Sequence, residues 1–365
     1  MSKSVINTHG RGARINHPNK FEKHHQEWDE NYLEYCRKEG ESAEENKTRY
    51  LFTDPKSIVN KVTSPDVGMS WSMNPYQGCE HGCIYCYARN THEYWGLNAG
   101  LDFERTVLVK RSAPDLLEKK LRSRNWEAET IVLSGNTDCY QPAEKKFQIT
   151  KKCLEVFLKY QHPVSIITKN GLILRDLKIL AALHEYRLTG VHISITTLEE
   201  KTRRLLEPRT ASIKKRLQTV TALRKEGIPV NVMVAPIIPG LNSHEILPIA
   251  EAARDAGANS IGYTVVRLNG AVGPIFTDWV QKTLPDRAQK IISQIKECHG
   301  GQLNDSRYGV RNKGEGVIAS QIQHLIRVAK NKYFNDAQSF QLNTALYEGR
   351  KKHLLRNEGD QLTLF

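Results

Sequence analysis

Three cysteines lie close together in the segment CEHGCIYC, at positions Cys79, Cys83 and Cys86. Three thiolates at this spacing can hold one face of a soft metal centre and leave one coordination position open. Metal sites that serve only a structural purpose usually fill every position, whereas working sites keep one free. The spacing therefore predicts a short loop that binds a metal centre and presents its open side to a ligand.

The other cysteines do not suggest a disulfide framework. The chain has 7 cysteines, an odd number without a pairing pattern, which favours metal binding in a reducing compartment. Cys153 falls in the apolar helical pattern KKCLEVFL and is predicted to belong to the core. From the residues alone, a zinc site completed by His81 or Cys139 is an alternative interpretation.

From about residue 69 the sequence alternates between strand and helix patterns. β-branched, apolar strands are predicted at 69–74, 130–135, 164–169, 191–196, 229–236 and 260–268. Helices are predicted from near Ile84 and at 144–160, 173–186, 212–227, 244–257 and 278–298. Six such units predict an α/β fold, an open (β/α)6 partial barrel of the TIM type with N- and C-terminal extensions. A flavodoxin-like open sheet shares much of this pattern.

The chain is predicted to have three regions. Residues 1–68 form a polar N-terminal extension in which only residues 25–38 have helical spacing, and a poorly ordered tail is the alternative. Residues 69–270 form the barrel. Residues 271–365 form a C-terminal helical region, expected to pack on or cap the open side of the barrel, which ends in the peptide QLTLF.

The string MNPYQGCEHGCIYCYAR, residues 73–89, resembles the cluster loop of radical S-adenosylmethionine (SAM) enzymes, and most of all the branch related to spore photoproduct lyase. The resemblance covers approximately residues 69 to 270. It implies a 4Fe–4S cluster held by the three cysteines, with SAM bound at the fourth iron and cleaved by one electron to a 5′-deoxyadenosyl radical. It also implies an electron donor such as flavodoxin or ferredoxin, and it places Tyr85 against the adenine of SAM.

Residues that directly follow the strands are the other candidates for the site, because ligands bind at the carboxyl ends of parallel strands. The resemblance places the segment after the second strand near the SAM amino group, although the sequence here departs from the GGE of the superfamily. It assigns the SAM carboxylate or ribose to a lysine and a serine after the next two strands. An arginine further on is able to grip a carboxylate. The candidate SAM-binding residues are Ser134, Gly135, Asn136, Asp138, Lys169, Ser194 and Arg209.

Cys139 and Tyr87 are candidate catalytic residues. Spore photoproduct lyases complete their reaction with a hydrogen atom from a cysteine near the second strand, assisted by a tyrosine. Tyr87 matches that tyrosine. Cys139 lies in the corresponding loop but follows the Thr-Asp pair instead of preceding it, and a buried structural cysteine is the alternative.

The formal charge of +13 favours a polyanionic partner. Together with the resemblance, which implies a radical enzyme, this charge leads us to expect an enzyme that acts on nucleic acid, and the resemblance implies damaged DNA as one such substrate. A radical enzyme acting on RNA or a peptide is an alternative, as is a non-enzymatic nucleic-acid-binding protein with a structural metal.

The last five residues, QLTLF, resemble the peptide by which bacterial repair and replication proteins bind the sliding clamp. The sequence has no apolar run approaching the roughly 20 residues of a membrane span, and its N-terminus lacks an apolar signal-peptide core. These features predict a cytoplasmic protein that does not enter a membrane.

Overall fold

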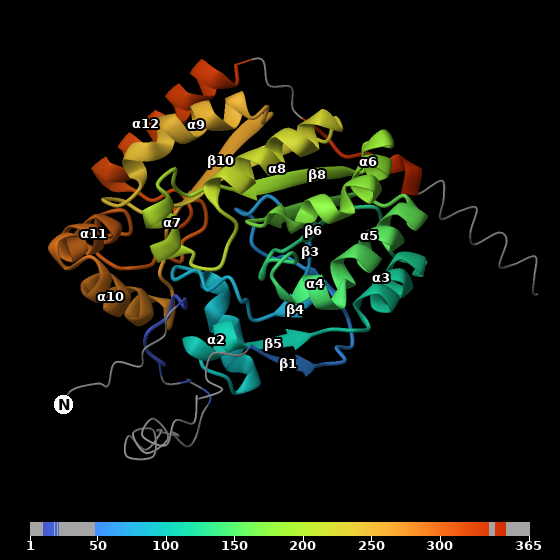
Figure 1. Ribbon diagram of the computed structural model, residues 1–365, viewed down its shortest axis with the longest axis horizontal. Helices are drawn as coiled ribbons and strands as arrows, with labels where there is room; N and C mark the ends of the chain where they lie inside the picture. Colours follow the sequence, from blue (N-terminus) through green and yellow to red (C-terminus); the bar gives the residue numbers. More distant parts are fainter. Residues whose placement is uncertain (1–9, 18, 20, 22–47, 336–339, 348–365) are drawn as a thin grey trace, which may run out of the picture.

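The computed structural model describes residues 10–17, 19, 21, 48–335 and 340–347. Its main feature is an open sheet with the strand order β10-β9-β8-β7-β6-β3-β2 (Figure 1). Six of its strands run parallel and match the six predicted strands, and β2 is added antiparallel to β3. Within the described residues β10 and β2 are the two edges, so the predicted open barrel is confirmed. The strands are β2 (Val59–Lys61), β3 (Trp71–Met73), β6 (Ile131–Leu133), β7 (Val164–Thr168), β8 (Thr189–Ser194), β9 (Val230–Ile237) and β10 (Ser260–Val265).

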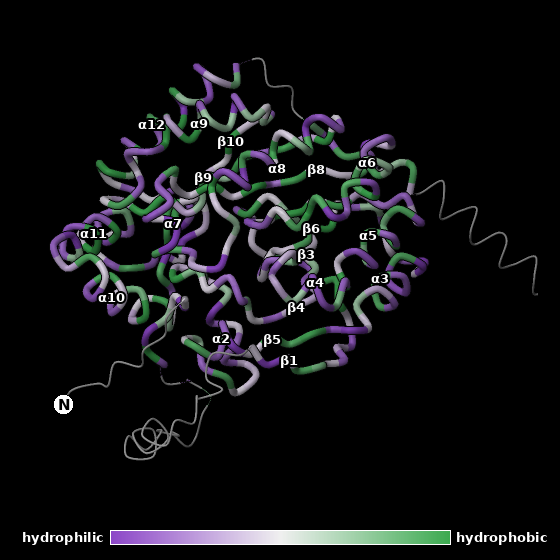
Figure 2. Tube along the Cα trace, in the orientation of Figure 1, coloured by the Kyte–Doolittle hydropathy of each residue, from purple (hydrophilic) through white to green (hydrophobic). Residues whose placement is uncertain are grey.

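Helices cover the outer face of this sheet. α8 packs on β8 and β9, α9 packs on β9 and β10, and α12 packs on α9, α11 and β10. Buried apolar residues such as Ile166, Val191 and Val232 lie on the strands between them, and Figure 2 shows green segments in the region of the sheet, as expected for strands that are covered by helices. The layer consists of α3 (Ala113–Arg122), α5 (Ile149–Tyr160), α6 (Leu177–Glu185), α8 (Ile213–Lys225), α9 (Ile246–Asp255) and α12 (Gly316–Tyr333).

The remaining helices lie mainly in the connections. They are α2 (Leu101–Arg105), α4 (Ala143–Phe147), α7 (Glu200–Leu206), α10 (Val272–Thr283) and α11 (Pro285–Glu297), with the 3-10 helices η2 (Tyr87–Trp95), η3 (Gly171–Asp176) and η4 (Ser243–Glu245).

The predicted helices 173–186 and 244–257 begin as the 3-10 helices η3 and η4, and three other predicted helices differ more from the structure. No helix begins near Ile84; a 3-10 helix, η2, begins at Tyr87 instead. The predicted helix 144–160 is divided into α4 and α5, because Gln148 has a left-handed φ of 52°. The predicted helix 278–298 is divided into α10 and α11 at Pro285, a residue that cannot continue a helix but suits the first turn of the next one.

A second, smaller sheet with the order β1-β5-β4 was not predicted. It comprises β1 (Arg49–Phe52), β5 (Thr106–Val109) and β4 (Tyr76–Gln77). β1 belongs to the stretch that the sequence pattern assigned to an irregular extension. The sequence pattern does not predict β1, because it is a short edge strand whose residues are mostly exposed and show no apolar alternation.

A loop before α12 joins the two edges of the main sheet. The backbone amide of Val265 in β10 donates to the carbonyl of Asn312, 2.8 Å away. The neighbouring Arg311 donates to the carboxylate of Asp66, in the turn between β2 and β3, through Nε at 2.8 Å and Nη2 at 2.5 Å. Within the described residues, a backbone hydrogen bond and an ion pair therefore connect the loop to both edges of the open sheet.

Two predictions concern other parts of the chain. Residues 25–38 and the peptide QLTLF, residues 361–365, lie outside the described residues. Among the helices that the structure describes, none combines the length and the apolar character that crossing a membrane requires.

Candidate active site

A cavity of about 270 Å³ opens at the carboxyl ends of the parallel strands. Cys79, Cys83 and Cys86 line one side of it. The remaining walls come from the ends of all the parallel strands from β6 to β10, which is the end of the sheet where ligands are expected. The walls include Tyr85, Tyr87, Ser134, Asn136, Thr137, Asp138, Thr168, Lys169, Ser194, Met233, Ala235, Pro236 and Arg267.

The three thiols suit a metal centre. None of them is part of a disulfide, and all three face the same cavity. Burial raises the pKa of each thiol, to about 12 for Cys83. A bound cationic centre would offset this effect and hold the sulfurs as thiolates. The donor set therefore fits a metal cluster that takes three cysteine ligands.

The zinc interpretation gains no support from the neighbouring side chains. Both ring nitrogens of His81 have protein partners, with Nδ1 3.4 Å from Asp138 and Nε2 3.2 Å from Asn170. Cys139 does not line the cavity.

Tyr85 is held by a buried ionic network. Its hydroxyl donates to Glu207, whose carboxylate also accepts from Thr196 at 2.9 Å and from Arg216. Burial alone would raise the pKa of Glu207, but Arg216 and Lys169 lower it to about 2, so the carboxylate is charged. The ammonium of Lys169 lies 5.9 Å from the centre of the Tyr85 ring. The network holds the hydroxyl end of Tyr85 in place, and Tyr85 is among the residues that line the cavity.

Asp138 organises the loop after β6 and lies beside the cysteine loop, 3.4 Å from Nδ1 of His81. Its carboxylate accepts hydrogen bonds from the hydroxyl of Thr168 at 2.8 Å and from the backbone amides of Lys169 at 2.8 Å and Tyr140 at 2.9 Å. Burial would raise its pKa, but the nearby His81 and these amide donors lower it to about 2. Asp138 thus brings a negative charge to the cavity and ties the loop after β6 to the end of β7.

The loop after β6 is tightly constrained. Ser134 has a positive φ of 71°, and a Cβ atom on Gly135 would lie 2.3 Å from the hydroxyl oxygen of Ser72. The backbone amide of Asn136 donates to Asn74 at 2.8 Å. Gly135 is not among the lining residues, and its carbonyl accepts a hydrogen bond from the hydroxyl of Tyr87. The small residues predicted here allow the loop to pass close to β3.

The sequence did not single out Arg267 or Glu207 as site residues. Arg267 lines the cavity directly after β10, and the strand-end rule that identified Lys169 after β7 could have found it. Glu207 lies in a loop after α7, and its contact with Tyr85 depends on the packing of distant segments. No local sequence pattern encodes such a contact.

Besides Gly135, two predicted site residues do not line the cavity. Cys139 is fully buried in the main core, and burial raises the pKa of its thiol well above the usual value. Arg209 donates its backbone amide to His81 at 3.3 Å, and its guanidinium lies 3.8 Å from Glu80. Arg209 therefore sits behind the cysteine loop in this structure.

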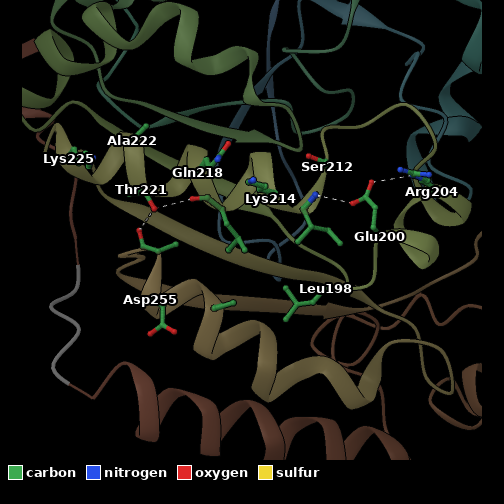
Figure 3. Close-up of a pocket in the computed structure, with 14 residues that line it drawn as sticks. Leu198, Glu200, Arg204, Ser212, Lys214, Gln218, Thr221, Ala222, Lys225 and Asp255 are labelled. Atoms are coloured by element: carbon green, nitrogen blue, oxygen red, sulfur yellow. Dashed lines mark hydrogen bonds and ion pairs between the residues drawn. The ribbon is translucent and has the colours of Figure 1, made fainter.

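A wider groove of about 1090 Å³ lies on the outer surface beside α8 and α9 (Figure 3). Several of its polar groups hold the helices together: Thr221 donates to the carbonyl of Ala256 at 3.2 Å, and Glu200 accepts from the amide of Ile213 at 3.3 Å. The residues that line it include no cysteine or histidine. The smaller cavity, which the three cysteines line, is therefore the candidate active site.

Comparison with protein families gives one match. Residues 73–253 match the model of the radical SAM superfamily. An uncharacterised protein of Mycobacterium tuberculosis is 32% identical over 247 residues, which cover 67% of this chain and 72% of the relative. A radical SAM Nα-GlyT isomerase of Pseudomonas phage M6 is 22% identical over 234 residues, covering 62% of this chain and 46% of that protein.

Solved structures of spore photoproduct lyase share the fold. The complex with dinucleoside spore photoproduct has a TM-score of 0.57 at 16% identity, over 78% of this chain and 79% of that one. A mutant with bound SAM and the same dinucleoside has a TM-score of 0.58 at 16% identity, over 80% and 82% of the two chains. At this level of identity the likeness concerns the fold.

Proposed function

This chain belongs to the radical SAM superfamily, and we propose that it uses a 4Fe–4S cluster and SAM to start radical chemistry on nucleic acid. The observation that carries the proposal is that Cys79, Cys83 and Cys86 face a single cavity at the carboxyl ends of the parallel strands. When bound, the cluster and SAM supply a one-electron cleavage that the protein's own side chains cannot perform. The electron would come from a donor such as flavodoxin or ferredoxin, and the reducing conditions that the thiols require suit the cytoplasm.

The walls of the cavity offer the contacts that SAM needs. We assign the SAM carboxylate or ribose to Lys169 and Ser194, which follow or end neighbouring strands and both line the cavity. The amino group of SAM is assigned to the loop that contains Ser134, Asn136 and the charged Asp138. Tyr85 would present its fixed ring to the adenine.

Arg209 and Gly135 have indirect roles in this assignment. Gly135 shapes the loop and receives the hydroxyl of Tyr87. Arg209 supports the cysteine loop from behind through His81 and Glu80. A bidentate grip of Arg209 on SAM would require its side chain to turn towards the cavity.

Nucleic acid is the proposed substrate because of the charge of +13 and the groups at the cavity. Tyr87 lines the cavity with 53% of its surface exposed, and Arg267 lines it as a cation. An exposed aromatic ring beside a cation can stack on an unpaired base. The shared fold with spore photoproduct lyase supports DNA-lesion repair as the reaction class.

A radical reaction on another substrate, RNA or peptide, is the second candidate. The phage relative, whose name describes an isomerase, supports a rearrangement reaction as the alternative to lesion repair. Transfer of deuterium between labelled SAM and a panel of DNA lesions, RNA and peptides would separate the two, because only the true substrate exchanges label.

Anaerobic reconstitution tests the proposal directly. We expect about four irons per chain, the content of one 4Fe–4S cluster, and cleavage of SAM to 5′-deoxyadenosine when a reductant is added. Replacement of Cys79, Cys83 or Cys86 by Ala should abolish both, whereas the same change at the core residue Cys153 should not. Binding of zinc without cleavage of SAM would contradict the proposal and favour a non-enzymatic nucleic-acid-binding protein.

We also propose that the peptide QLTLF docks on the bacterial sliding clamp. Gln361 would form hydrogen bonds, and Leu362, Leu364 and Phe365 would fill an apolar pocket. Deleting residues 361–365 should abolish binding to the purified clamp, and unchanged binding would rule this proposal out.

A further inference from the structure

Residues 10–17, here called the N-terminal strap, lie against the back of the cysteine loop, residues 79–86. The strap is the dark blue segment beside α2 in Figure 1. A Cβ atom on Gly12 would lie 1.9 Å from the carbonyl oxygen of Gly82, which stands between the first two cysteines of the loop. Ala13 is fully buried and packs in one apolar cluster with Cys83 and Ile84. Only a glycine permits this approach of the two backbones.

Glu104 in α2 clamps the strap in place. Its two carboxylate oxygens accept the backbone amide of Gly12 at 2.9 Å and that of Ala13 at 2.7 Å. The side chain of Arg11 returns a hydrogen bond to the carbonyl of Glu104 at 2.7 Å. The strap thus supplies three donors to one residue.

The same carboxylate connects to the cysteine loop through Arg89. Arg89 donates to Glu104 at 2.6 Å, and both side chains are completely buried. Arg89 also donates to the carbonyls of Gly82 at 3.2 Å and Cys83 at 3.0 Å. A continuous set of hydrogen bonds therefore runs from the strap through Glu104 and Arg89 to the backbone between the cysteines.

We propose that the N-terminal strap is a positioning element that holds the cysteine loop in its metal-binding shape. No strap residue lines the cavity, so the strap acts through Glu104, Arg89 and Gly82. If it were lost, the buried carboxylate of Glu104 would lose two backbone donors, and a buried charge tolerates such a loss poorly. The inference rests on the proposed function only in taking the three cysteines as cluster ligands.

The test compares Gly12→Ala with Gly190→Ala in the full chain. A Cβ atom on Gly190 would lie 3.7 Å from the ring of Phe340 and 4.0 Å from the carbonyl oxygen of Pro229, both ordinary contacts, so this variant is the matched control. Release of the strap is followed on the apo protein by trypsin cleavage after Arg11 and Arg14. The metal site is followed by iron content after anaerobic reconstitution and by the rate at which a chelator removes that iron. A second variant, Glu104→Gln, replaces one acceptor of the strap amides by an amide donor.

We expect both Gly12→Ala and Glu104→Gln to speed the trypsin cleavage and to raise the rate of iron loss at least tenfold, while the control matches the wild type in both. A released strap with normal iron retention would overturn the proposal, and so would a strap that neither variant releases. Failure of the wild-type chain to take up iron would instead contradict the proposed function, while the trypsin result would still report on the clamp.

Discussion

The hydroxyl of Tyr85 donates a hydrogen bond to the carboxylate of Glu207, 122 positions further along the chain. Tyr85 stands between two of the cavity cysteines, and Glu207 belongs to the loop that precedes α8. Because Glu207 is also paired with the buried Arg216 of α8, the cysteine loop is tied to the helix layer. Tyr85 therefore contributes in two ways that can be tested separately, through its aromatic ring and through the hydrogen bond of its hydroxyl.

Replacing Tyr85 by Phe should keep the ring and lose the hydrogen bond. We expect SAM to bind nearly as well as to the wild type, with a free energy of unfolding lower by about 1–3 kcal/mol because the buried carboxylate loses a donor. Tyr85→Ala should weaken SAM binding as well. Equilibrium dialysis with labelled SAM and urea unfolding measure the two effects.

Tyr140→Phe is the control for this pair. Its hydroxyl donates to the buried carboxylate of Asp176 at 3.1 Å, away from the cavity lining. It should therefore lower stability by a similar amount and leave SAM binding unchanged. Equal loss of SAM binding in Tyr85→Phe and Tyr85→Ala would show that the ring itself is not the contact.

Lys169 is expected to bind a negatively charged part of SAM. Lys169→Met should weaken SAM binding by about 10- to 100-fold, the loss of one charged hydrogen bond of about 1.5–3 kcal/mol, with iron content unchanged. The exposed Lys215 offers the matched control, Lys215→Met, which should bind SAM normally. Normal binding by Lys169→Met would remove the residue from the site.

The hydrogen-atom relay assigned to Cys139 can be tested against a second buried cysteine. Cys139 and Cys153 are both fully buried in the main core, so replacing either by Ala should lower stability by a comparable amount. If Cys139 is the relay, only Cys139→Ala will cleave SAM without completing turnover of substrate. If both variants behave alike once loaded with iron, the residue serves packing.

The stability of the fold should depend on pH through His162. Burial lowers the pKa of this imidazole from 6.5 to about 3. Its Nε2 accepts from the indole of Trp126 at 3.0 Å, so only the unprotonated nitrogen fits. Above about pH 6.5 the ring is neutral in both states. As the pH falls from 6.5 towards 3, the unfolded chain takes up the proton and the folded chain does not, so the free energy of unfolding falls.

The expected slope is roughly 1.4 kcal/mol per pH unit for this group. Urea unfolding at pH 7, 6 and 5 should show that His162→Phe is less stable at pH 7 and has a shallower dependence on pH than the wild type. The exposed His324 provides the control, since His324→Gln should keep the wild-type slope. An unchanged slope in His162→Phe would show that other groups dominate.

The parallel sheet was predictable because most of its strands carry buried apolar residues and are followed by a helix. Periodicity could not reveal β1, whose residues are mostly exposed, or the left-handed Gln148 that divides α4 from α5. That the three cysteines line one cavity with Lys169 and Asp138 was predictable from the cysteine spacing and from the places of the other two residues after strands. The contact of Glu207 with Tyr85 and that of Glu104 with Gly12 could not be predicted, because they join segments that only the folded chain brings together.

The residues that line the cavity are spread from Cys79 to Arg267, so the ribosome synthesises them at different times. The cysteines emerge from the ribosome early, whereas Arg267 is synthesised after nearly every strand of the sheet. At the usual rates of translation the interval between Cys86 and Arg267 lasts roughly ten to forty seconds. During that time the three thiols have no complete pocket around them, so a metal centre bound before Arg267 is made would lack the wall that this residue supplies.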